Sequence, residues 1–130
     1  MKRRVLAAAA AALLITTGSA LADGGRPIGY GQQYLAALTS QDVPWANGRR
    51  ANAWSFQAAS DGCAIVRMES AAFDPAIQVV RDGLNGATVA RGGDEAHAVG
   101  LQPAQTYYII ATSAGSGEQL GPYVISLARC

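Results

Sequence analysis

The amino-acid sequence predicts an all-β protein, a sandwich or barrel of about eight short strands. Segments in which apolar and polar side chains alternate recur at near-regular spacing from residue 33 to the end of the chain. Clusters of Gly, Pro, Asp and Asn separate these segments, and such residues favour turns. After residue 22, no stretch has apolar residues at the spacing of an amphipathic helix. Strands therefore account for the regular structure that we expect.

The N-terminal 22 residues have the features of a secretory signal peptide. Basic residues at positions 2–4 precede an apolar run over residues 5–15. Ala20-Leu21-Ala22 then supplies small residues at the two positions that a signal peptidase recognises. The pattern predicts that residues 1–22 are removed before Asp23 and that the protein is periplasmic or secreted. An uncleaved anchor helix is the alternative, but the apolar run has about half the usual spanning length.

The remainder of the chain is weakly acidic and has the size of one domain. Three of the ten Lys and Arg residues lie in the leader, which leaves seven arginines and no lysine against nine Asp and Glu. No basic stripe exists, which argues against nucleic acid or anionic lipid as a partner. We expect no membrane span after leader cleavage. Residues 33–130 contain no internal repeat or long linker and predict a single β-sandwich domain.

The first predicted elements follow a glycine-rich start. Residues 23–32 contain four glycines and a proline, which predicts a flexible N-terminal arm. Residues 33–39 are expected to form an edge strand, and the polar, turn-rich residues 40–52 a surface loop. Over 53–58 the aromatic side chains alternate with polar ones, so we expect a strand whose aromatic face is buried.

The centre of the predicted fold is the segment 73–82. Asp74-Pro75 predicts a turn, because proline fixes its own φ and disfavours the helical conformation in the preceding residue. Ile77 and Val79 then alternate with Gln78 and Val80. This period-2 pattern, rich in β-branched residues, is typical of a strand with one buried face. The same alternation predicts strands over 63–69, 95–101, 106–112 and 123–128, and a short strand is expected over 87–90, ended by Gly92-Gly93.

Cys63 and Cys130 are the only cysteines, and an exported protein with one pair is expected to form one disulfide. Cys63 shares a side of its strand with Arg67 and Glu69, the side that faces solvent. Cys130 continues the side of the last strand that carries Ser126, which also faces outward. Two outward cysteines on neighbouring strands of one sheet can be bridged. Two free thiols are the alternative, and a metal site on two lone cysteines is disfavoured.

The sequence offers no complete catalytic set. His97 is the only histidine, and a general base needs an oriented partner and a nucleophile within reach. Ser113 and Ser116 lie in or beside a glycine-serine loop without a Gly-x-Ser-x-Gly elbow. A solvent-facing strand histidine is the favoured interpretation. One histidine and two bridged cysteines also argue against a usual zinc site.

Two groups of residues are candidates for binding. Calcium could take oxygen ligands from Asp74, Asp94 and Glu95. The alternative is that Asp74 only forms a turn and that Asp94-Glu95 is a solvated turn. The acidic pair could equally serve acid–base chemistry, but nothing fixes the separation of the carboxylates. Trp45 in the polar loop and Tyr108 on the outer side of its strand are candidate surface-binding residues. The alternative for Tyr108 is an ordinary strand-forming role.

From Trp54 onward, the order of features resembles the bacterial pre-peptidase C-terminal domain family. The likeness covers an aromatic strand, a glycine turn, a hydrophobic strand, an Asp-Pro turn with two apolar anchors, an acidic pair and two tyrosine-containing strands. Glu95 departs from the second Asp of the family's acidic pair. The matching segments are Trp54-Ser55-Phe56, Gly62, 64–68, 73–79, Gly86, Asp94-Glu95, Tyr107-Tyr108-Ile109 and Tyr123-Val124-Ile125, with 38–42 and Asn47-Gly48-Arg49 upstream.

This resemblance implies a jelly-roll-like sandwich with a non-catalytic accessory role. Such domains usually trail secreted peptidases, and some bind matrix polymers or calcium. No enzyme precedes the domain in this sequence, so we expect a standalone binding or interaction module, not an enzyme, that contacts a protein or a cell-envelope or extracellular polymer without a required cofactor. A structural envelope protein without a small ligand is the alternative, and a small secreted hydrolase is a more distant one.

Overall fold

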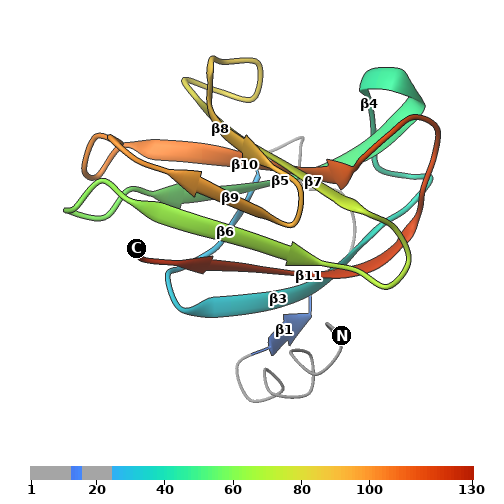
Figure 1. Cartoon of the computed structure of the whole chain (residues 1–130), viewed down its shortest axis with the longest axis horizontal. Coiled ribbons are helices and arrows are strands. Elements are labelled where there is room, and N and C mark those ends of the chain that lie inside the picture. The colour runs from blue at the N-terminus through green and yellow to red at the C-terminus, as the bar shows by residue number, and fades with distance from the viewer. Residues whose placement is uncertain (1–12, 16–24) are drawn as a thin grey trace.

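A computed structural model describes residues 13–15 and 25–130, which form two β-sheets packed face to face (Figure 1). The first sheet has the strand order β1-β3-β11-β6-β9, and the second has the order β2-β5-β10-β7-β8, with β4 beside β5. The strands of the first sheet are β1 (Leu13–Ile15), β3 (Gln32–Leu38), β6 (Ala64–Glu69), β9 (Glu95–Ala98) and β11 (Gly121–Ala128). Those of the second are β2 (Arg26–Pro27), β4 (Val43–Trp45), β5 (Arg49–Gln57), β7 (Pro75–Arg81), β8 (Thr88–Gly92) and β10 (Thr106–Ser113).

The chain passes between the two sheets at almost every connection. From β3 to β7 successive long strands alternate between sheets, β7 and β8 form a hairpin, and β9, β10 and β11 alternate again. Neighbouring long strands are all antiparallel. This leaves four long strands in each sheet with the connectivity of a jelly roll. The all-β prediction is therefore confirmed, as a sandwich with jelly-roll order.

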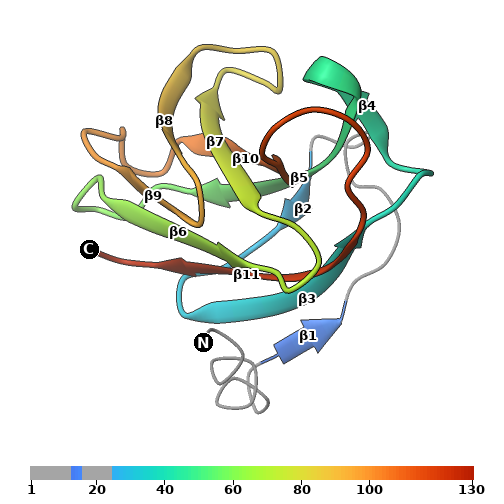
Figure 2. The same ribbon diagram turned by 45° about the vertical axis from the view of Figure 1, so that its right-hand side comes forward.

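Each of the eight predicted strands is present, and three short strands were not predicted. The segment 40–52 differs most, because it forms β4, a 3-10 turn (Ala46–Gly48) and the first residues of β5. Part of the segment expected as a flexible arm packs on the domain. Arg26–Pro27 pairs with β5 and Ile28 is buried, because an extended proline and an apolar side chain suit the sheet edge (Figure 2).

The core lies between the sheets and follows the predicted alternation. Trp54 and Phe56 on β5 point inward, as do Ile77 and Val79 on β7. Aromatic rings meet across this interior, with Tyr34 and Trp54 at 5.4 Å between ring centroids. The largest side chains with under 2% of their surface exposed are those of Trp54, Tyr123, Leu38, Met68, Ile109, Ile110, Ile125, Leu127, Val66, Val79 and Val80.

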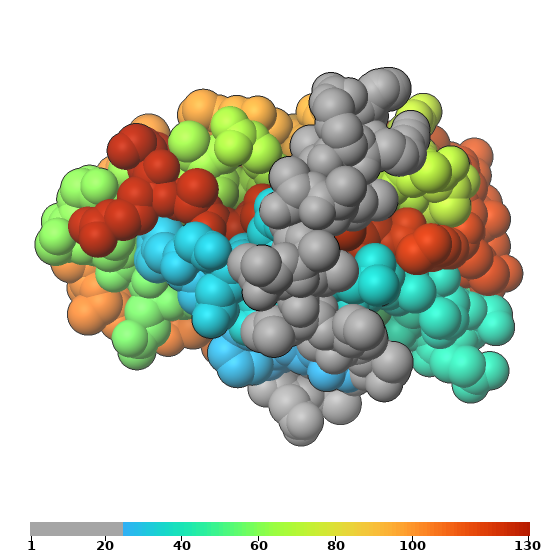
Figure 3. Space-filling model, turned by 90° about the horizontal axis from the view of Figure 1, so that it is seen from below, coloured from blue at the N-terminus to red at the C-terminus, as the bar shows by residue number. Residues whose placement is uncertain are grey.

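Cys63 and Cys130 form a disulfide on the outer side of the first sheet, with Cα atoms 5.7 Å apart. The antiparallel register of β6 and β11 places Ala128 opposite Ile65. Extending this register by two residues brings Cys130 opposite Cys63, which explains the bridge. Seen from below, the red chain end after β11 lies beside blue residues of β3 and green residues of β6 (Figure 3). The sequence prediction of outward cysteines on neighbouring strands is confirmed.

The expected signal peptide lies mostly outside the described residues. Its described part, β1, pairs in parallel with β3 so that Leu13 lies opposite Gln33 (Figure 1). Cleavage before Asp23 would remove β1 and make β3 the edge of the first sheet. Among the described residues, the structure has no helix that combines the length and the apolarity needed to cross a bilayer.

Candidate surface site on the second sheet

A short hairpin places Trp45 on the outer side of the second sheet. β4 pairs antiparallel with β5, so that Trp45 lies opposite Arg49. The 3-10 turn between them reverses the chain through Asn47 and Gly48, whose φ angles are 61° and 78°. Asn and Gly adopt this left-handed conformation more readily than other residues. The local sequence thus brings an aromatic ring and a guanidinium group together.

Arg49 is held in place by two backbone carbonyls. Its Nε donates a hydrogen bond to the carbonyl oxygen of Ala46 at 2.8 Å, and its Nη1 donates to that of Ser113 at 2.8 Å. A guanidinium group carries five N–H donors. Three donors therefore remain after these two bonds, on a side chain whose orientation is already fixed.

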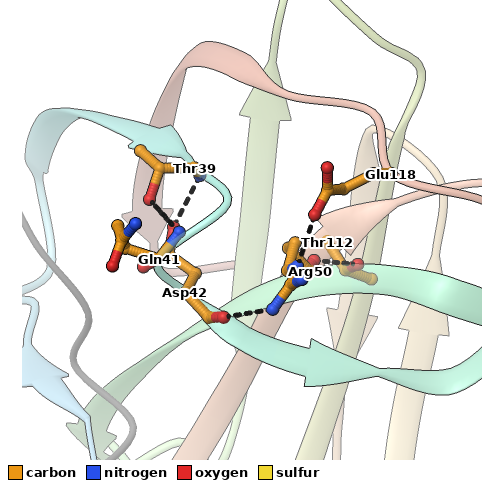
Figure 4. A network of polar contacts seen from close by, with 6 residues as sticks. All are labelled: Thr39, Gln41, Asp42, Arg50, Thr112 and Glu118. Carbon is orange, nitrogen blue, oxygen red and sulfur yellow. Dashed lines mark hydrogen bonds and ion pairs between the residues drawn. The ribbon is translucent and has the colours of Figure 1, made fainter.

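Arg50 joins the same hairpin to the neighbouring elements (Figure 4). It donates to the carbonyl oxygen of Asp42 at 3.0 Å and to the carboxylate of Glu118 at 2.8 Å. The carboxylate of Asp42 accepts bonds from the backbone N–H and the hydroxyl of Thr39. Thr112 on β10 donates its hydroxyl to the carbonyl oxygen of Arg50 at 2.6 Å. This network fixes the hairpin between β10 and the loop that leads to β11.

Beside the hairpin, the outer face of the second sheet contains a hollow of about 240 Å³. It runs across strands, because Thr112 on β10 lies opposite Ala76 on β7, and Gln78 on β7 lies opposite Arg91 on β8. The side chains at these paired positions share one face of the sheet. The lining residues are Trp45, Arg49, Ala76, Ile77, Gln78, Arg91, Gly92 and Thr112.

The hollow carries positive charge without a paired carboxylate. In the part of the chain that the structure describes, the ion pairs join Arg50 to Glu118, Arg67 to Glu95, Arg81 to Asp82 and His97 to Glu95. None of these pairs includes Arg49 or Arg91. Among the described residues, Arg91 makes only a long contact, of 3.5 Å, with the hydroxyl of Thr88. Both guanidinium groups are thus available to an anion.

An apolar strip continues from the hollow along the same face. Ile110 points outward on β10 and is nevertheless fully buried, together with the small side chains of Ala51 and Ala53. The partly buried side chains of Val43, Trp45 and Leu84 cover this strip. Trp45 therefore belongs to both features: its side chain packs on this strip, and the residue lines the hollow.

Tyr108, the second surface residue singled out in the sequence, lies on the same outer face. It pairs with Ser55 on β5 and with Val80 on β7, and it is partly exposed. It does not line the hollow that includes Trp45. The structure thus places both candidate residues on one face but only one of them at the hollow.

Two other hollows suit a ligand less well. One, of about 460 Å³, lies beside β2 and is lined by residues such as Ile28, Tyr30 and Phe56, with no charged side chain. The other, of about 310 Å³, lies on the first sheet and includes Gln33 and Arg67. Gln33 lies opposite Leu13 of β1. Because β1 belongs to the leader that export is expected to remove, the surroundings of this hollow would change in the exported protein. We therefore base the candidate site on the second sheet.

The residues of the hydrolase alternative lie apart. His97 is on β9 of the first sheet with 56% of its side chain exposed, and its partner is Glu95. Ser113 is on β10 of the second sheet and is completely buried, whereas Ser116 is exposed in the following loop. Hydrogen bonds from His97 and Arg67 hold the pKa of Glu95 below its ordinary value. His97 thus belongs to a surface ion-pair cluster.

The calcium candidates do not converge in the structure. Asp74 and Asp94 are exposed, and their backbone carbonyls accept bonds from the N–H groups of Ala114 and Met68. Glu95 is already bonded to basic partners. Among the described residues, no three His, Cys, Asp or Glu side chains gather where they could hold a metal ion. Calcium binding by these three residues stays a prediction.

A buried polar chain ties the two sheets together across the interior. Trp54 on β5 donates its indole N–H to the hydroxyl of Tyr123 on β11 at 3.1 Å. That hydroxyl donates to the side-chain oxygen of Asn52 at 2.7 Å. Burial raises the pKa of Tyr123 far above its ordinary value, even though the hydrogen bond from Trp54 lowers it. Tyr123 therefore keeps its proton in the folded protein.

Sequence reasoning found Trp45 but missed most of its neighbours at the hollow. Arg49 was assigned to a loop, whereas it begins β5. The alternation of side chains along their strands places three of them on the outer face, namely Gln78, Arg91 and Thr112. The sequence could therefore have shown that they share a face. The order of the strands across the sheet was needed to place them side by side.

The comparisons with known proteins bear on the fold. No family model and no curated protein matches the sequence. A solved structure does match it. The chain is similar to the pre-peptidase C-terminal domain of a collagenase from Bacillus anthracis, with a TM-score of 0.56, 14% sequence identity, and coverage of 79% of this chain and 93% of that domain. The resemblance inferred from the sequence is thus supported at the level of the fold, and the disulfide is compatible with export.

Proposed function

We propose that this protein is an exported, non-catalytic binding module that contacts a polymer or a protein through the outer face of its second sheet. The observation that carries the proposal is the hollow beside the β4–β5 hairpin, where a tryptophan meets two arginines that have no ion-pair partner among the described residues. Interfaces are enriched in aromatic residues and arginine, which contribute most of the binding energy.

The architecture favours binding over catalysis. The residues of the hollow sit on paired strands and on a hairpin anchored by Arg49 and Arg50, so the surface is formed before a partner arrives. A preformed surface loses little conformational freedom on binding. The hollow contains no histidine, carboxylate or thiol that could act as a general base or nucleophile. The similarity to the pre-peptidase C-terminal domain of a collagenase supports the sandwich fold on which this proposal is built.

A retention experiment tests the proposal. The full chain, expressed with its own N-terminal segment and recovered after export, is passed over immobilised neutral glucan, polygalacturonate and gelatin. We expect retention on at least one of these, and we expect Trp45→Ala to reduce it. Val99→Ala is the matched control, because Val99 is the most exposed large apolar side chain among the described residues and lies after β9 on the other sheet.

Two outcomes would contradict the proposal. Retention by none of the materials, with no partner cross-linked in the periplasm, would favour a structural envelope protein instead. Hydrolytic turnover that His97→Ala abolishes would show catalysis. Circular dichroism of each variant establishes that the fold is intact before retention is compared.

A further inference from the structure

We propose that the hollow binds a carboxylate-bearing sugar unit, so that the polymer recognised by this face is an anionic, uronate-type polysaccharide. This inference rests on the proposed function and specifies its ligand class. It is drawn from three features of the lining: two guanidinium groups without a carboxylate partner, an aromatic ring, and hydrogen-bonding groups between them.

The guanidinium groups select an anion. Arg49 keeps three N–H donors after its bonds to the carbonyl oxygens of Ala46 and Ser113. Because those two bonds fix its orientation, the remaining donors are directed without a further loss of side-chain freedom. Arg91 reaches the same hollow from β8. Planar guanidinium groups match the two oxygens of a carboxylate in a bidentate geometry.

The other lining groups suit a sugar ring. Trp45 offers an amphipathic indole ring, part of which is held against the apolar strip. Gln78 carries an amide with donors and an acceptor, and its Nε2 already donates to Thr88 at 2.7 Å. The amide oxygen of Gln78 can therefore accept a bond from a sugar hydroxyl. The apolar indole face thus suits the face of a sugar ring, and the amide oxygen suits a sugar hydroxyl. The guanidinium groups suit the carboxylate of a uronic acid.

The shape of the site favours a polysaccharide over an acidic peptide. The hollow lies across the face of the sheet, where the backbone N–H and C=O groups of β10 and β7 are already paired with each other. Extended peptides are captured mainly by unpaired backbone groups at a sheet edge. At about 240 Å³, the hollow is smaller than the roughly 300 Å³ at which pockets begin to enclose a whole small ligand. It is therefore suited to one unit of a longer chain.

The test compares polygalacturonate with its methyl-esterified form, which keeps the same ring and removes the charge. Binding to the exported full chain is measured by isothermal titration calorimetry at low and at moderate salt. We expect the acid form to bind and the ester to bind about tenfold more weakly or worse, because a charge-assisted hydrogen bond is lost. Raising the salt should weaken binding to the acid form.

Variants assign the binding to this hollow. Arg91→Gln and Trp45→Ala should each weaken polygalacturonate binding by about tenfold or more. Arg129→Gln is the charge-matched control, because Arg129 is exposed near the disulfide on the first sheet. Arg91→Gln changes an exposed side chain and removes no core contact, so it tests the proposal even if Trp45→Ala fails to fold.

Each other result overturns the inference in a recognisable way. Equal binding of acid and ester, or equal loss with Arg129→Gln, would exclude recognition of the carboxylate at this hollow. Poly-glutamate that binds as tightly, with the same dependence on Arg91, would assign the site to acidic peptides. Retention on neutral glucan or gelatin without polygalacturonate binding would overturn the ligand class and leave the proposed function standing. Retention on none of these materials, with no partner cross-linked in the periplasm, would overturn both.

Discussion

Removing the disulfide is expected to destabilise the protein through its unfolded state. The bridge joins residues 67 apart in sequence. In the chain-entropy relation, a closed loop of that length lowers the free energy of folding by about 4 kcal/mol at 25 °C. Cys130 is exposed and Cys63 is only partly buried, so replacing both by serine opens no cavity in the core. The expected loss is thus a large share of the roughly 5–15 kcal/mol by which domains are stable.

Equilibrium unfolding in guanidinium chloride measures this loss. The double variant, Cys63→Ser with Cys130→Ser, should lose about 4 kcal/mol of unfolding free energy and show a larger m-value, because its unfolded chain exposes more surface. A loss of this size should also lower the thermal midpoint by roughly 15–30 °C. Each single variant should cost as much as the double variant, because either change removes the same bond.

Two results would contradict this expectation. A loss below about 1 kcal/mol with an unchanged m-value would mean that the unfolded chain is already restricted without the bridge. Reductant serves as the control, because it should destabilise the natural sequence and leave the double variant unchanged. If the two single variants instead showed additive losses, the cysteines would be acting through separate contacts.

Four further results are expected. Tyr123→Phe should cost about 1–3 kcal/mol of stability by ultraviolet-monitored unfolding, because Asn52 and Trp54 lose a buried partner. Since burial raises the pKa of Tyr123, the unfolded state loses its proton first, so stability should be fully present below pH about 10 and fall above it, with a shallower fall in Tyr123→Phe. If Asp74, Asp94 and Glu95 bind calcium as the sequence predicts, the ion should raise the thermal midpoint and Asp94→Asn should abolish the rise, whereas an unchanged midpoint would contradict that prediction. Mass spectrometry of the exported protein should show Asp23 as its first residue, and an intact leader would contradict the signal-peptide prediction.

The alternation of side chains was sufficient to predict most of the fold. Seven of the eight long strands were located from period-2 patterns, and the strand sides assigned to Cys63 and Cys130 were compatible with the bridge expected of a single cysteine pair. These inferences succeed because a strand with one buried face leaves a local trace in the sequence. The local sequence does not show which strands are neighbours in a sheet. The residues that line the hollow could therefore not be predicted from the sequence.

The segment 40–52 shows why local patterns failed at the site. Arg50 and Asn52 look like loop residues, yet both lie in β5. Their polar groups are bonded by partners more than 60 positions away in sequence, namely Thr112, Glu118 and Tyr123. A strand end rich in polar residues is stable when such long-range partners supply its hydrogen bonds. Nothing within the segment itself reveals those partners.

Ile110 illustrates a second kind of long-range effect. The alternation along β10 directs Ile110 to the outer face of the sandwich, but the structure leaves it no exposed surface. The hairpin carrying Trp45 and the turn carrying Leu84 fold over it and form a second, smaller apolar cluster. The outer face of the second sheet is therefore not a plain solvent face. The same covering that buries Ile110 positions Trp45 at the rim of the hollow.

Stability and binding should be separable in this architecture. The disulfide joins β6 to β11 on the outer side of the first sheet, whereas the hollow lies on the outer face of the second. The groups that orient Arg49 are carbonyl oxygens on the hairpin and on β10, and neither belongs to the bridged strands. A disulfide-free variant that remains folded should thus bind its ligand with the affinity of the natural sequence. A loss of binding in that folded variant would show that the two sheets are coupled, and the hollow could then not be regarded as preformed by the second sheet alone.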